Sequence, residues 1–342
     1  MSVVPDNVWD VGAAPDPAAA VLDAYASDGV MALRTSGTTS RPRFVHRTAA
    51  SWVDSFGHVS RLAGIDSSSR VWVPGPLAAT MNLFAAAHAR WAGATVVATP
   101  GEATHAQLTP AVLARCVAQG VDLRDRHVVV AGERLPEELA RVAGESGVRT
   151  SHYYGAAELS FVAWGTHAGD LGPFPGVEVA VRQGEIWARS PYLSLGYAGE
   201  PGPLRFDRGG FATVGDRGRL TGGVLTVTGR GAGTVVTAGA TVLVSDVEQV
   251  LREASGCEVV VLGIEHPRLG GLVTALLTDA IAYPRARAAA RTELARAQRP
   301  VRWFHVPELP LTSAGKVDRV ALAGLAIAGR LTPLGRAPAG MR

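Results

Sequence analysis

Lys316 is the only lysine among the 33 basic side chains of the sequence, so the other 32 are arginines. It lies in the segment 310–319, among residues typical of turns. An ammonium is a compact point charge on a flexible stem that can reach into a site, which the rigid fork of arginine does not reproduce. The single lysine therefore indicates a chemical role, and a lysine on a surface turn after a glycine is the alternative.

A loop rich in hydroxyl groups follows an expected strand at 30–33 and extends to Arg43. Backbone N–H groups and hydroxyls of such a loop can wrap the oxygens of a polyphosphate, and Arg43 would add positive charge. The glycine-lysine ending of a Walker loop is absent. A Ser/Thr-rich turn that binds nothing is the alternative. The candidate phosphate-binding residues are Thr35, Ser36, Gly37, Thr38 and Thr39.

Two acidic residues follow glycine-containing turns. Glu158 comes after an expected strand end and after Gly155, which would let the backbone approach a ligand closely. A single carboxylate in such a place commonly holds Mg²⁺ together with substrate phosphates, and the alternative is an acid at a helix N-terminus. Asp216 can bind the two hydroxyls of a ribose or close an Asx turn. Tyr154 can stack on a base or fill the core.

The elements that must position these residues alternate between strand and helix over the first half of the chain. We expect helices at 18–27, 48–63, 77–91, 108–119 and 136–144, and strands at 30–33, 70–73, 95–98, 127–131 and 149–154. This alternation predicts parallel βαβ units, in which ligands bind at the carboxyl ends of the strands. Two such ends carry polar residues, namely Gly132 with Glu133 and the run from Tyr154 to Glu158.

After residue 173 the pattern changes to short strands separated by turn residues, which predicts an antiparallel region appended to the α/β part. The glycine-rich run 229–234 is a candidate hinge between domains. The remainder reads as a compact α+β unit that ends in the lysine segment. The sequence thus predicts a large α/β domain over residues 1–229 and a small α+β domain over residues 230–342.

Composition limits the possible classes. The 342 residues are 47% hydrophobic and 18% charged, with 40 glycines, which favours a globular α/β enzyme. The net charge is +3 and no basic run interleaved with aromatics appears, so the sequence does not favour a nucleic-acid partner. Two cysteines lack metal-ligand spacing, and neither a signal peptide nor a membrane span is evident. We expect a cytoplasmic protein with no membrane contact.

The order of these stretches resembles the adenylate-forming (ANL) superfamily, which includes AMP-forming acyl-CoA synthetases. Residues 35–43 are similar to its TSGTTGxPK loop, 154–158 to its YGxTE motif, and 214–218 to its TGDxG motif. Residues 229–248 resemble its hinge segment, and 310–319 match PxTxxGKxxR. The short actinobacterial o-succinylbenzoate CoA ligases look most similar among the members, judged by brevity and by the run 236–239.

The resemblance implies ATP-dependent activation of a carboxylic acid, with Mg²⁺, release of pyrophosphate, and transfer of the acyl group to a thiol, usually that of CoA. Lys316 would bridge the carboxylate and the α-phosphate, Glu158 would ligate Mg²⁺, and Asp216 would bind the ribose with Arg230 nearby. The loop residues from Thr35 to Thr39 would hold the β- and γ-phosphates together with Arg43. The adenine slot would be lined by Gly132, Glu133 and Tyr154, and Gly155 is a further candidate for nucleotide binding.

The sequence also departs from the family pattern. Ser40 replaces a glycine, Arg43 replaces a lysine, and Ala157 replaces the threonine before the metal-binding glutamate. Ala232 and Gly233 stand where the hinge acids are usual. The phosphate loop begins at residue 35, whereas family members usually have more than a hundred residues before it. We therefore expect an N-terminally short member whose acyl pocket is small and open or is covered by another subunit, such as a homodimer partner.

Two other functions stay open. The chain can be an adenylating enzyme that transfers the acyl group to an amine or to a carrier-protein thiol. It can also be a non-catalytic nucleotide- or acyl-binding protein that acts with a partner. The expected pocket walls, residues 76–84, 151–155 and 156–161, are rich in alanine and aromatics and favour an apolar or aromatic acid of moderate size.

Overall fold

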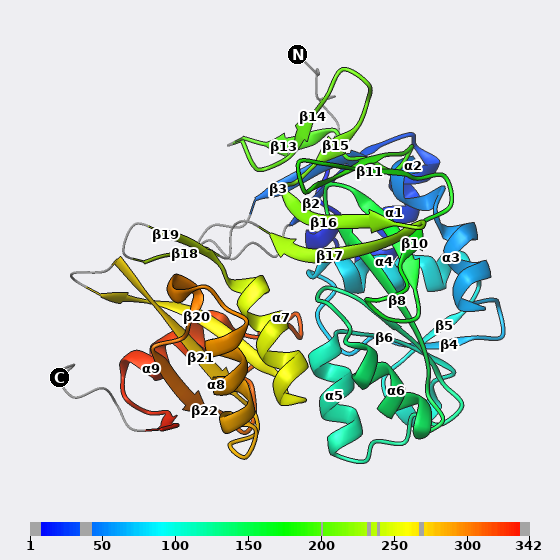
Figure 1. The fold of residues 1–342 in the computed structure, drawn as a ribbon. Coiled ribbons are helices and arrows are strands. Elements are labelled where there is room, and N and C mark those ends of the chain that lie inside the picture. The colour runs from blue at the N-terminus through cyan, green and yellow to red at the C-terminus, as the bar shows by residue number, and fades with distance from the viewer. Residues whose placement is uncertain are drawn as a thin grey trace. The chain divides into compact units, whose positions relative to one another are not determined.

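The computed structural model describes residues 8–34, 43–199, 201–230, 234–237, 240–266 and 270–335 (Figure 1). The chain forms two compact units. The first consists of residues 1–227 together with 313–316, and the second of residues 228–312 together with 317–342. The turn that carries the single lysine is thus grouped with the first unit, although the chain on both sides of it belongs to the second.

In the described part of the first unit, the central sheet has seven strands in the order β10-β9-β8-β7-β6-β4-β5. Strands β4 to β8 are parallel, and β9 and β10 are added antiparallel. Strand β7 reads His-Val-Val-Val and is buried throughout, as expected for a parallel strand covered on both faces. The bounds are β4 Arg70–Trp72, β5 Thr95–Val97, β6 His105–Leu108, β7 His127–Val130, β8 Arg149–Ala156, β9 Ser160–Gly165 and β10 Gly172–Pro173.

Helices cover both faces of this sheet. Helix α4 (Thr80–Trp91) connects β4 to β5, which lies at one edge of the sheet. Helices α5 (Pro110–Ala118) and α6 (Glu137–Glu145) connect β6 to β7 and β7 to β8, so this part of the chain proceeds toward the opposite edge. Because such crossovers are right-handed, opposite directions of travel place α4 on one face and α5 and α6 on the other (Figure 1). The remaining helices of this unit are α1 Pro17–Ala26, α2 Ala50–Val53 and α3 Phe56–Ala63, with 3₁₀ turns η1 Val11–Ala13 and η2 Pro100–Glu102.

Two further sheets complete the first unit. One has the order β1-β2-β3-β13, and the other has the order β14-β15-β12-β16-β17 with β11 paired to β12. The β11–β12 hairpin turns through Gln183 and Gly184, whose φ angles of 52° and 78° suit a tight primed turn. The bounds are β1 Val8–Trp9, β2 Val30–Arg34, β3 Phe44–Thr48, β11 Glu178–Arg182, β12 Glu185–Arg189, β13 Gly196–Ala198, β14 Arg205–Phe206, β15 Ala212–Thr213, β16 Asp216–Thr221 and β17 Val224–Arg230.

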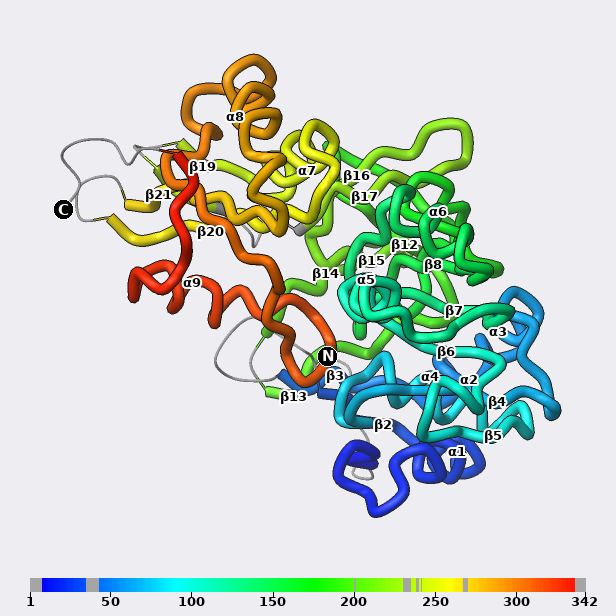
Figure 2. The backbone as a smooth tube through the Cα atoms, turned by 90° about the horizontal axis from the view of Figure 1, so that it is seen from below, coloured from blue at the N-terminus to red at the C-terminus, as the bar shows by residue number. Residues whose placement is uncertain are grey.

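The second unit is a mixed sheet with helices. Its strand order is β19-β18-β21-β22-β23, and β20 pairs with β21. Figure 2 traces this part of the chain from the yellow α7 to the red α9. Val247 and Leu251, one helical turn apart on α7, are both fully buried and pack with strand residues such as Val261. The bounds are β18 Thr234–Thr237, β19 Ala240–Leu243, α7 Val244–Ser255, β20 Val259–His266, β21 Gly270–Leu277, α8 Tyr283–Thr292, η3 Arg296–Gln298, β22 Arg302–His305, α9 Arg319–Ile327 and β23 Thr332–Pro333.

Some expected elements differ in the structure. The single helix expected at 48–63 is two helices, α2 and α3, preceded by strand β3. Between them, the Ser55 hydroxyl donates to the Trp52 carbonyl at 2.6 Å, a side-chain bond that competes with the helical ladder. Strands β6 and β9 are absent from the sequence prediction, and β6 lies just before the expected helix that begins at Leu108.

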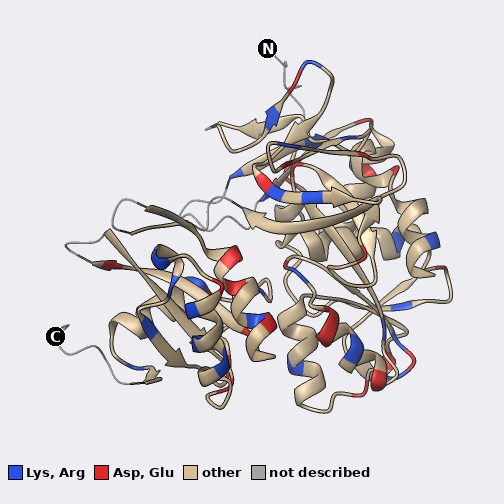
Figure 3. Ribbon diagram, viewed as in Figure 1, with Lys and Arg blue, Asp and Glu red and all other residues tan. Residues whose placement is uncertain are grey.

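Charged side chains of both signs are interspersed along the described elements (Figure 3). In those same parts of the chain, no helix has the length and the apolar composition that a bilayer crossing requires.

Candidate functional site

The carboxyl ends of β7 and β8 lie side by side because the two strands are parallel neighbours. Gly132 and Glu133 follow β7, and Tyr154 and Gly155 lie near the end of β8. The two polar strand ends singled out from the sequence therefore share one edge of the sheet. Ligands of open α/β sheets bind at this kind of edge.

Glu158 lies in the turn between β8 and β9, and only 5% of its surface is exposed. Its Oε1 accepts a hydrogen bond from the Tyr197 hydroxyl at 2.6 Å, and its backbone carbonyl accepts one from the Ser194 N–H at 2.8 Å. A strand follows this turn, so the alternative of an acid at a helix N-terminus is wrong. Glu158 is a buried carboxylate that is held by Ser194, just before β13, and by Tyr197 in β13.

Asp216 begins β16 and is 7% exposed. The Tyr154 hydroxyl donates to its Oδ2 at 2.9 Å, which joins two residues that are 62 positions apart in the chain. Each candidate carboxylate of this unit thus accepts a hydrogen bond from a tyrosine. From the sequence, Tyr154 is expected at a base or in the core. The bond of Tyr197 to Glu158 could not be expected, because the two residues are 39 positions apart in the chain.

Arg47 is a functional candidate that the sequence analysis missed. Its side chain is fully buried, and its guanidinium donates to the Ser51 hydroxyl at 3.0 Å, to the Ala157 carbonyl at 3.2 Å and to the Tyr192 carbonyl. Burial lowers the pKa of Arg47 to about 9, and the nearby Glu158 carboxylate opposes this shift. A pKa of about 9 leaves the group positively charged near neutral pH. The alternation along β3 is the one available signal, since Val45 and Arg47 share a buried face.

The turn that carries Lys316 has close contacts within the first unit. The Thr109 hydroxyl donates to the Gly315 carbonyl at 2.5 Å. A Cβ added at Gly132, whose φ is +91°, would lie 3.2 Å from Lys316 Cε. Gly315 itself has a φ of +75°, which suits glycine. The glycine after β7 thus leaves the space that the lysine side chain occupies.

The structure describes only part of the expected phosphate loop and hinge. Arg43 lies directly before β3 and is partly buried. Arg230 is the last residue of β17. The calls that fall outside the described residues are Thr35, Ser36, Gly37, Thr38, Thr39 and Ser40 in the loop and residues 231–233 in the hinge.

Gly155 has a structural reason to be glycine. A Cβ at this position would lie 2.2 Å from the Ser160 carbonyl oxygen across the β8–β9 pair, and the register of that pair shifts between Tyr154 and Gly155. This close approach of two backbones explains the residue without any ligand.

We expect Gly155→Ala to lower the free energy of unfolding of the first unit by about 1–3 kcal/mol, because an added methyl group must push two paired strands apart. Urea unfolding followed by circular dichroism measures this change. Gly144→Ala is the matched control, since a Cβ on this α6 glycine meets nothing within 4 Å and should be neutral or slightly stabilising. Equal stability of the two variants would contradict the packing explanation.

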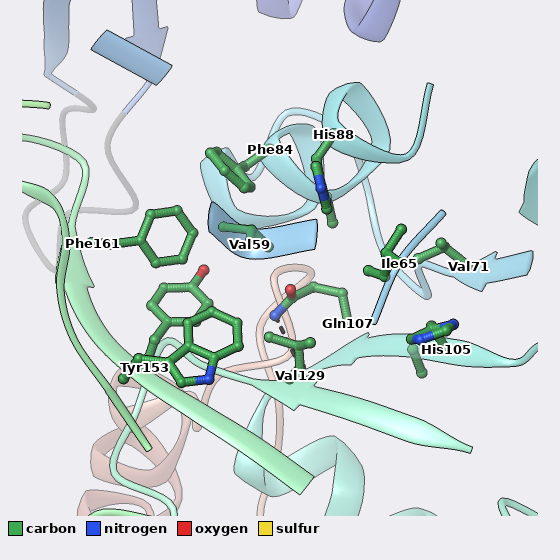
Figure 4. Close-up of a pocket in the computed structure, with 13 residues that line it drawn as sticks. Val59, Ile65, Val71, Phe84, His88, His105, Gln107, Val129, Tyr153 and Phe161 are labelled. Carbon is green, nitrogen blue, oxygen red and sulfur yellow. Dashed lines mark hydrogen bonds between the residues drawn. The ribbon is translucent and has the colours of Figure 1, made fainter. Parts of the chain in front are cut away.

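A cavity of about 20 Å³ lies between α4 and the central sheet (Figure 4). Three of its lining residues, Phe84, Tyr153 and Phe161, belong to the pocket walls expected from the sequence. Their rings pack edge to face or tilted, with centroids 4.8 Å apart for Phe84 and Phe161 and 4.4 Å apart for Tyr153 and Phe161. The expected pocket region is therefore largely filled by its own aromatic side chains.

His152 is a buried structural residue. Its Nε2 accepts from the Leu135 N–H at 3.4 Å, so its Nδ1 carries the proton and donates to the Val130 carbonyl at 2.9 Å. Burial lowers the pKa of His152 to about 4, which keeps the ring neutral at physiological pH.

Three or more His, Cys, Asp or Glu side chains do not gather into a possible metal site in the parts of the chain that the structure describes. A lone buried carboxylate nevertheless suits Mg²⁺, which keeps several waters and binds through one or two carboxylates plus substrate phosphates. Glu158, in the turn that follows β8, fits that pattern.

Comparison with known proteins adds to this geometry. Residues 9–198 match the model of the family described as AMP-binding enzyme, which is more than half of the chain. The chain belongs to the AMP-binding enzyme family. The 2-succinylbenzoate–CoA ligase of Salmonella typhimurium is 32% identical over 228 residues, which cover 64% of this chain and 50% of that protein. An uncharacterized acyl–CoA ligase of Bacillus subtilis is 26% identical and is matched over 83% of this chain and 66% of its own length.

Solved structures of similar proteins confirm the fold class. A variant of Escherichia coli MenE with bound OSB-AMS has a TM-score of 0.72 at 25% identity, with 86% of this chain and 68% of that chain covered. The amide bond synthetase McbA of Marinactinospora thermotolerans has a TM-score of 0.68 at 25% identity, with 86% and 69% covered. The chain spans about half the length of the 2-succinylbenzoate–CoA ligases of Salmonella typhimurium and Escherichia coli that it matches.

Proposed function

We propose that the chain activates a carboxylic acid with ATP and transfers the acyl group to CoA. The carboxylate oxygen attacks the α-phosphorus of ATP, which forms an acyl-adenylate and releases pyrophosphate. The thiol then attacks the acyl carbon, a thioester forms, and AMP leaves. The observation that carries the proposal is the placement of Tyr154, Glu158 and Asp216 with the Lys316 turn in one unit, at the edge where β7 and β8 end.

Each candidate residue has a proposed role. Lys316 holds the substrate carboxylate and the α-phosphate and stabilises the charge that develops between them. Asp216 binds the ribose hydroxyls, with Arg230 nearby. The hydrogen bond from Tyr154 to Asp216 places the tyrosine beside the ribose site, which supports a role for Tyr154 next to the base. The remaining nucleotide contacts are Thr35, Ser36, Gly37, Thr38, Thr39 and Arg43 to the β- and γ-phosphates, and Gly132, Glu133 and Gly155 around the adenine.

Glu158 is the proposed ligand for Mg²⁺. Bound Mg²⁺ would neutralise phosphate charge while the substrate carboxylate attacks and pyrophosphate leaves. The Tyr197 hydroxyl fixes one carboxylate oxygen of Glu158 and so sets the direction of its second carboxylate oxygen. We further propose two domains, residues 1–229 and 230–342, that rotate about residues 231–233 between the two half-reactions.

The acid is proposed to be apolar or aromatic and of moderate size. The names of the relatives, 2-succinylbenzoate–CoA ligases, support an aromatic acid. An amine acceptor in place of CoA is the second candidate, and the likeness to an amide bond synthetase supports it. A carrier-protein thiol remains a third acceptor of the same acyl-adenylate.

Pyrophosphate release from ATP and Mg²⁺ tests the proposal across a panel of aromatic, aliphatic and succinyl-substituted acids. We expect release that depends on one class of acid, and AMP release that rises when CoA is added. A rise with an amine but not with CoA would favour the amide-forming alternative. Stabilisation by ATP without pyrophosphate release for any acid would contradict the enzymatic function and favour a binding protein.

A further inference from the structure

We propose that Arg47 is a positioning residue that fixes the turn carrying Glu158 and thereby sets the affinity of the site for the metal–ATP complex. The inference rests on the proposed function, in which Glu158 binds Mg²⁺ together with ATP. Arg47 does not itself touch the metal in this proposal. It acts through two backbone carbonyls.

The first of these carbonyls belongs to Ala157, which directly precedes Glu158. Arg47 Nη1 donates to the Ala157 oxygen at 3.2 Å, across 110 positions of sequence. The Leu159 N–H donates to the Ala156 carbonyl at 3.1 Å and closes the same turn. A displacement of the Ala157 peptide would therefore rotate the Glu158 side chain directly.

The second carbonyl belongs to Tyr192, in the segment that leads to β13. Arg47 Nη2 donates to this oxygen, and the stretch from Tyr192 through β13 also supplies two hydrogen bonds to Glu158, from the Ser194 N–H and from the Tyr197 hydroxyl. The guanidinium therefore joins the turn that bears Glu158 to the segment that holds it. The planar fork of arginine suits two carbonyls in fixed directions, and an ammonium would not satisfy both in the same way.

The base of the Arg47 side chain is held as well. Its Nε donates to the Ser51 hydroxyl at 3.0 Å, and its guanidinium lies 5.5 Å from the Trp52 ring centroid. Its own strand, β3, pairs with β13 in the register Val45 to Tyr197. A charged group with no surface exposure is costly to bury unless its hydrogen bonds are made. The hydrogen bonds of this buried guanidinium therefore indicate that it holds the two backbone carbonyls in position.

The test is equilibrium binding of Mn²⁺ to the full chain in the presence of ATP and without any acid, measured by electron paramagnetic resonance. We expect Arg47→Met, which has similar length and no charge, to weaken Mn²⁺ binding by about 10- to 100-fold, as loss of a group that orients a metal ligand does. Arg47→Lys keeps the charge but not the fork, and we expect an intermediate loss. This variant also supplies the test if Arg47→Met does not fold.

Ser51→Ala is the matched control, because it removes the Nε partner and leaves the two carbonyl contacts in place. It should lower the Tm by about 3 °C and change Mn²⁺ binding less than twofold. If Arg47→Met and Arg47→Lys bind Mn²⁺ and ATP as the wild type does, Arg47 serves stability alone and the inference is wrong. If the wild type itself does not bind Mn²⁺ and ATP, the proposed function fails instead.

Discussion

Lys316→Ala is expected to lower the rate of pyrophosphate release by about 10²- to 10³-fold, with a smaller change in the KM for ATP. The ammonium is proposed to stabilise charge that develops only as the carboxylate attacks, so its loss affects the transition state more than the bound nucleotide. No other lysine exists in the sequence to substitute for it. Single-turnover release of pyrophosphate with the best acid of the panel measures the change.

Two further variants sharpen this prediction. Lys316→Arg keeps the charge, but the guanidinium is larger, and the space in front of Gly132 is narrow enough that a Cβ there would meet Lys316 Cε at 3.2 Å. We therefore expect little recovery of the rate. Ser313→Ala, in the same turn and exposed, serves as the control and should stay within twofold of the wild type. A wild-type rate for Lys316→Ala would remove the lysine from the mechanism.

Glu248→Gln is expected to lower the free energy of unfolding of the second unit by about 3 kcal/mol, the lower end of the range for a buried ion pair that loses one partner. Glu248 is 4% exposed. It accepts hydrogen bonds from Arg252 at 2.9 Å and from the Val261 N–H at 2.8 Å, and it forms an ion pair with Arg319 at 2.8 Å. An amide cannot balance two guanidinium groups. Both arginines keep some contact with water, which limits the loss.

Hydrogen exchange of β20 measures this effect in the full chain, because Val261 lies at the centre of that strand. Glu253→Gln is the matched control on the same helix. Glu253 is exposed and accepts a hydrogen bond from Gln249, so the change should stay within about 0.5 kcal/mol. Similar exchange rates in the two variants would show that the buried network contributes little.

Much of the fold could be predicted from local sequence patterns. Strand β7 could be recognised because His-Val-Val-Val is a continuous β-branched run, and α5 because apolar residues recur at helical spacing. Strand β6, His-Ala-Gln-Leu, gave no such signal, since two polar residues occupy a strand that is buried on all four residues. His105 and Gln107 are tolerated there because they bond to the carbonyls of Ala63 and Val129.

The candidate site was predictable to the extent that its residues carry local signals. Glu158 and Asp216 stood out because glycines and strand ends surround them. Arg47 and Tyr197 did not, because their significance lies in partners 110 and 39 positions away, which only the folded chain brings together. The sequence suggested that Gly155 leaves room for a ligand. The structure adds that a side chain at this position would collide with the Ser160 carbonyl.

The backbone contacts at the base of the lysine turn limit how fast the turn can move. Leu311 and Val317 form a β-bridge, and the Asp318 N–H donates to the Pro310 carbonyl at 2.7 Å, so the chain is tied together on both sides of the turn. Arg319, one residue further on, is tied to the Val261 carbonyl at 3.0 Å. We expect a tip closed in this way to move less on the nanosecond scale than an open loop does. We therefore expect the backbone of the turn to move together with the residues that tie it, on the scale of microseconds to milliseconds that is typical of collective motions.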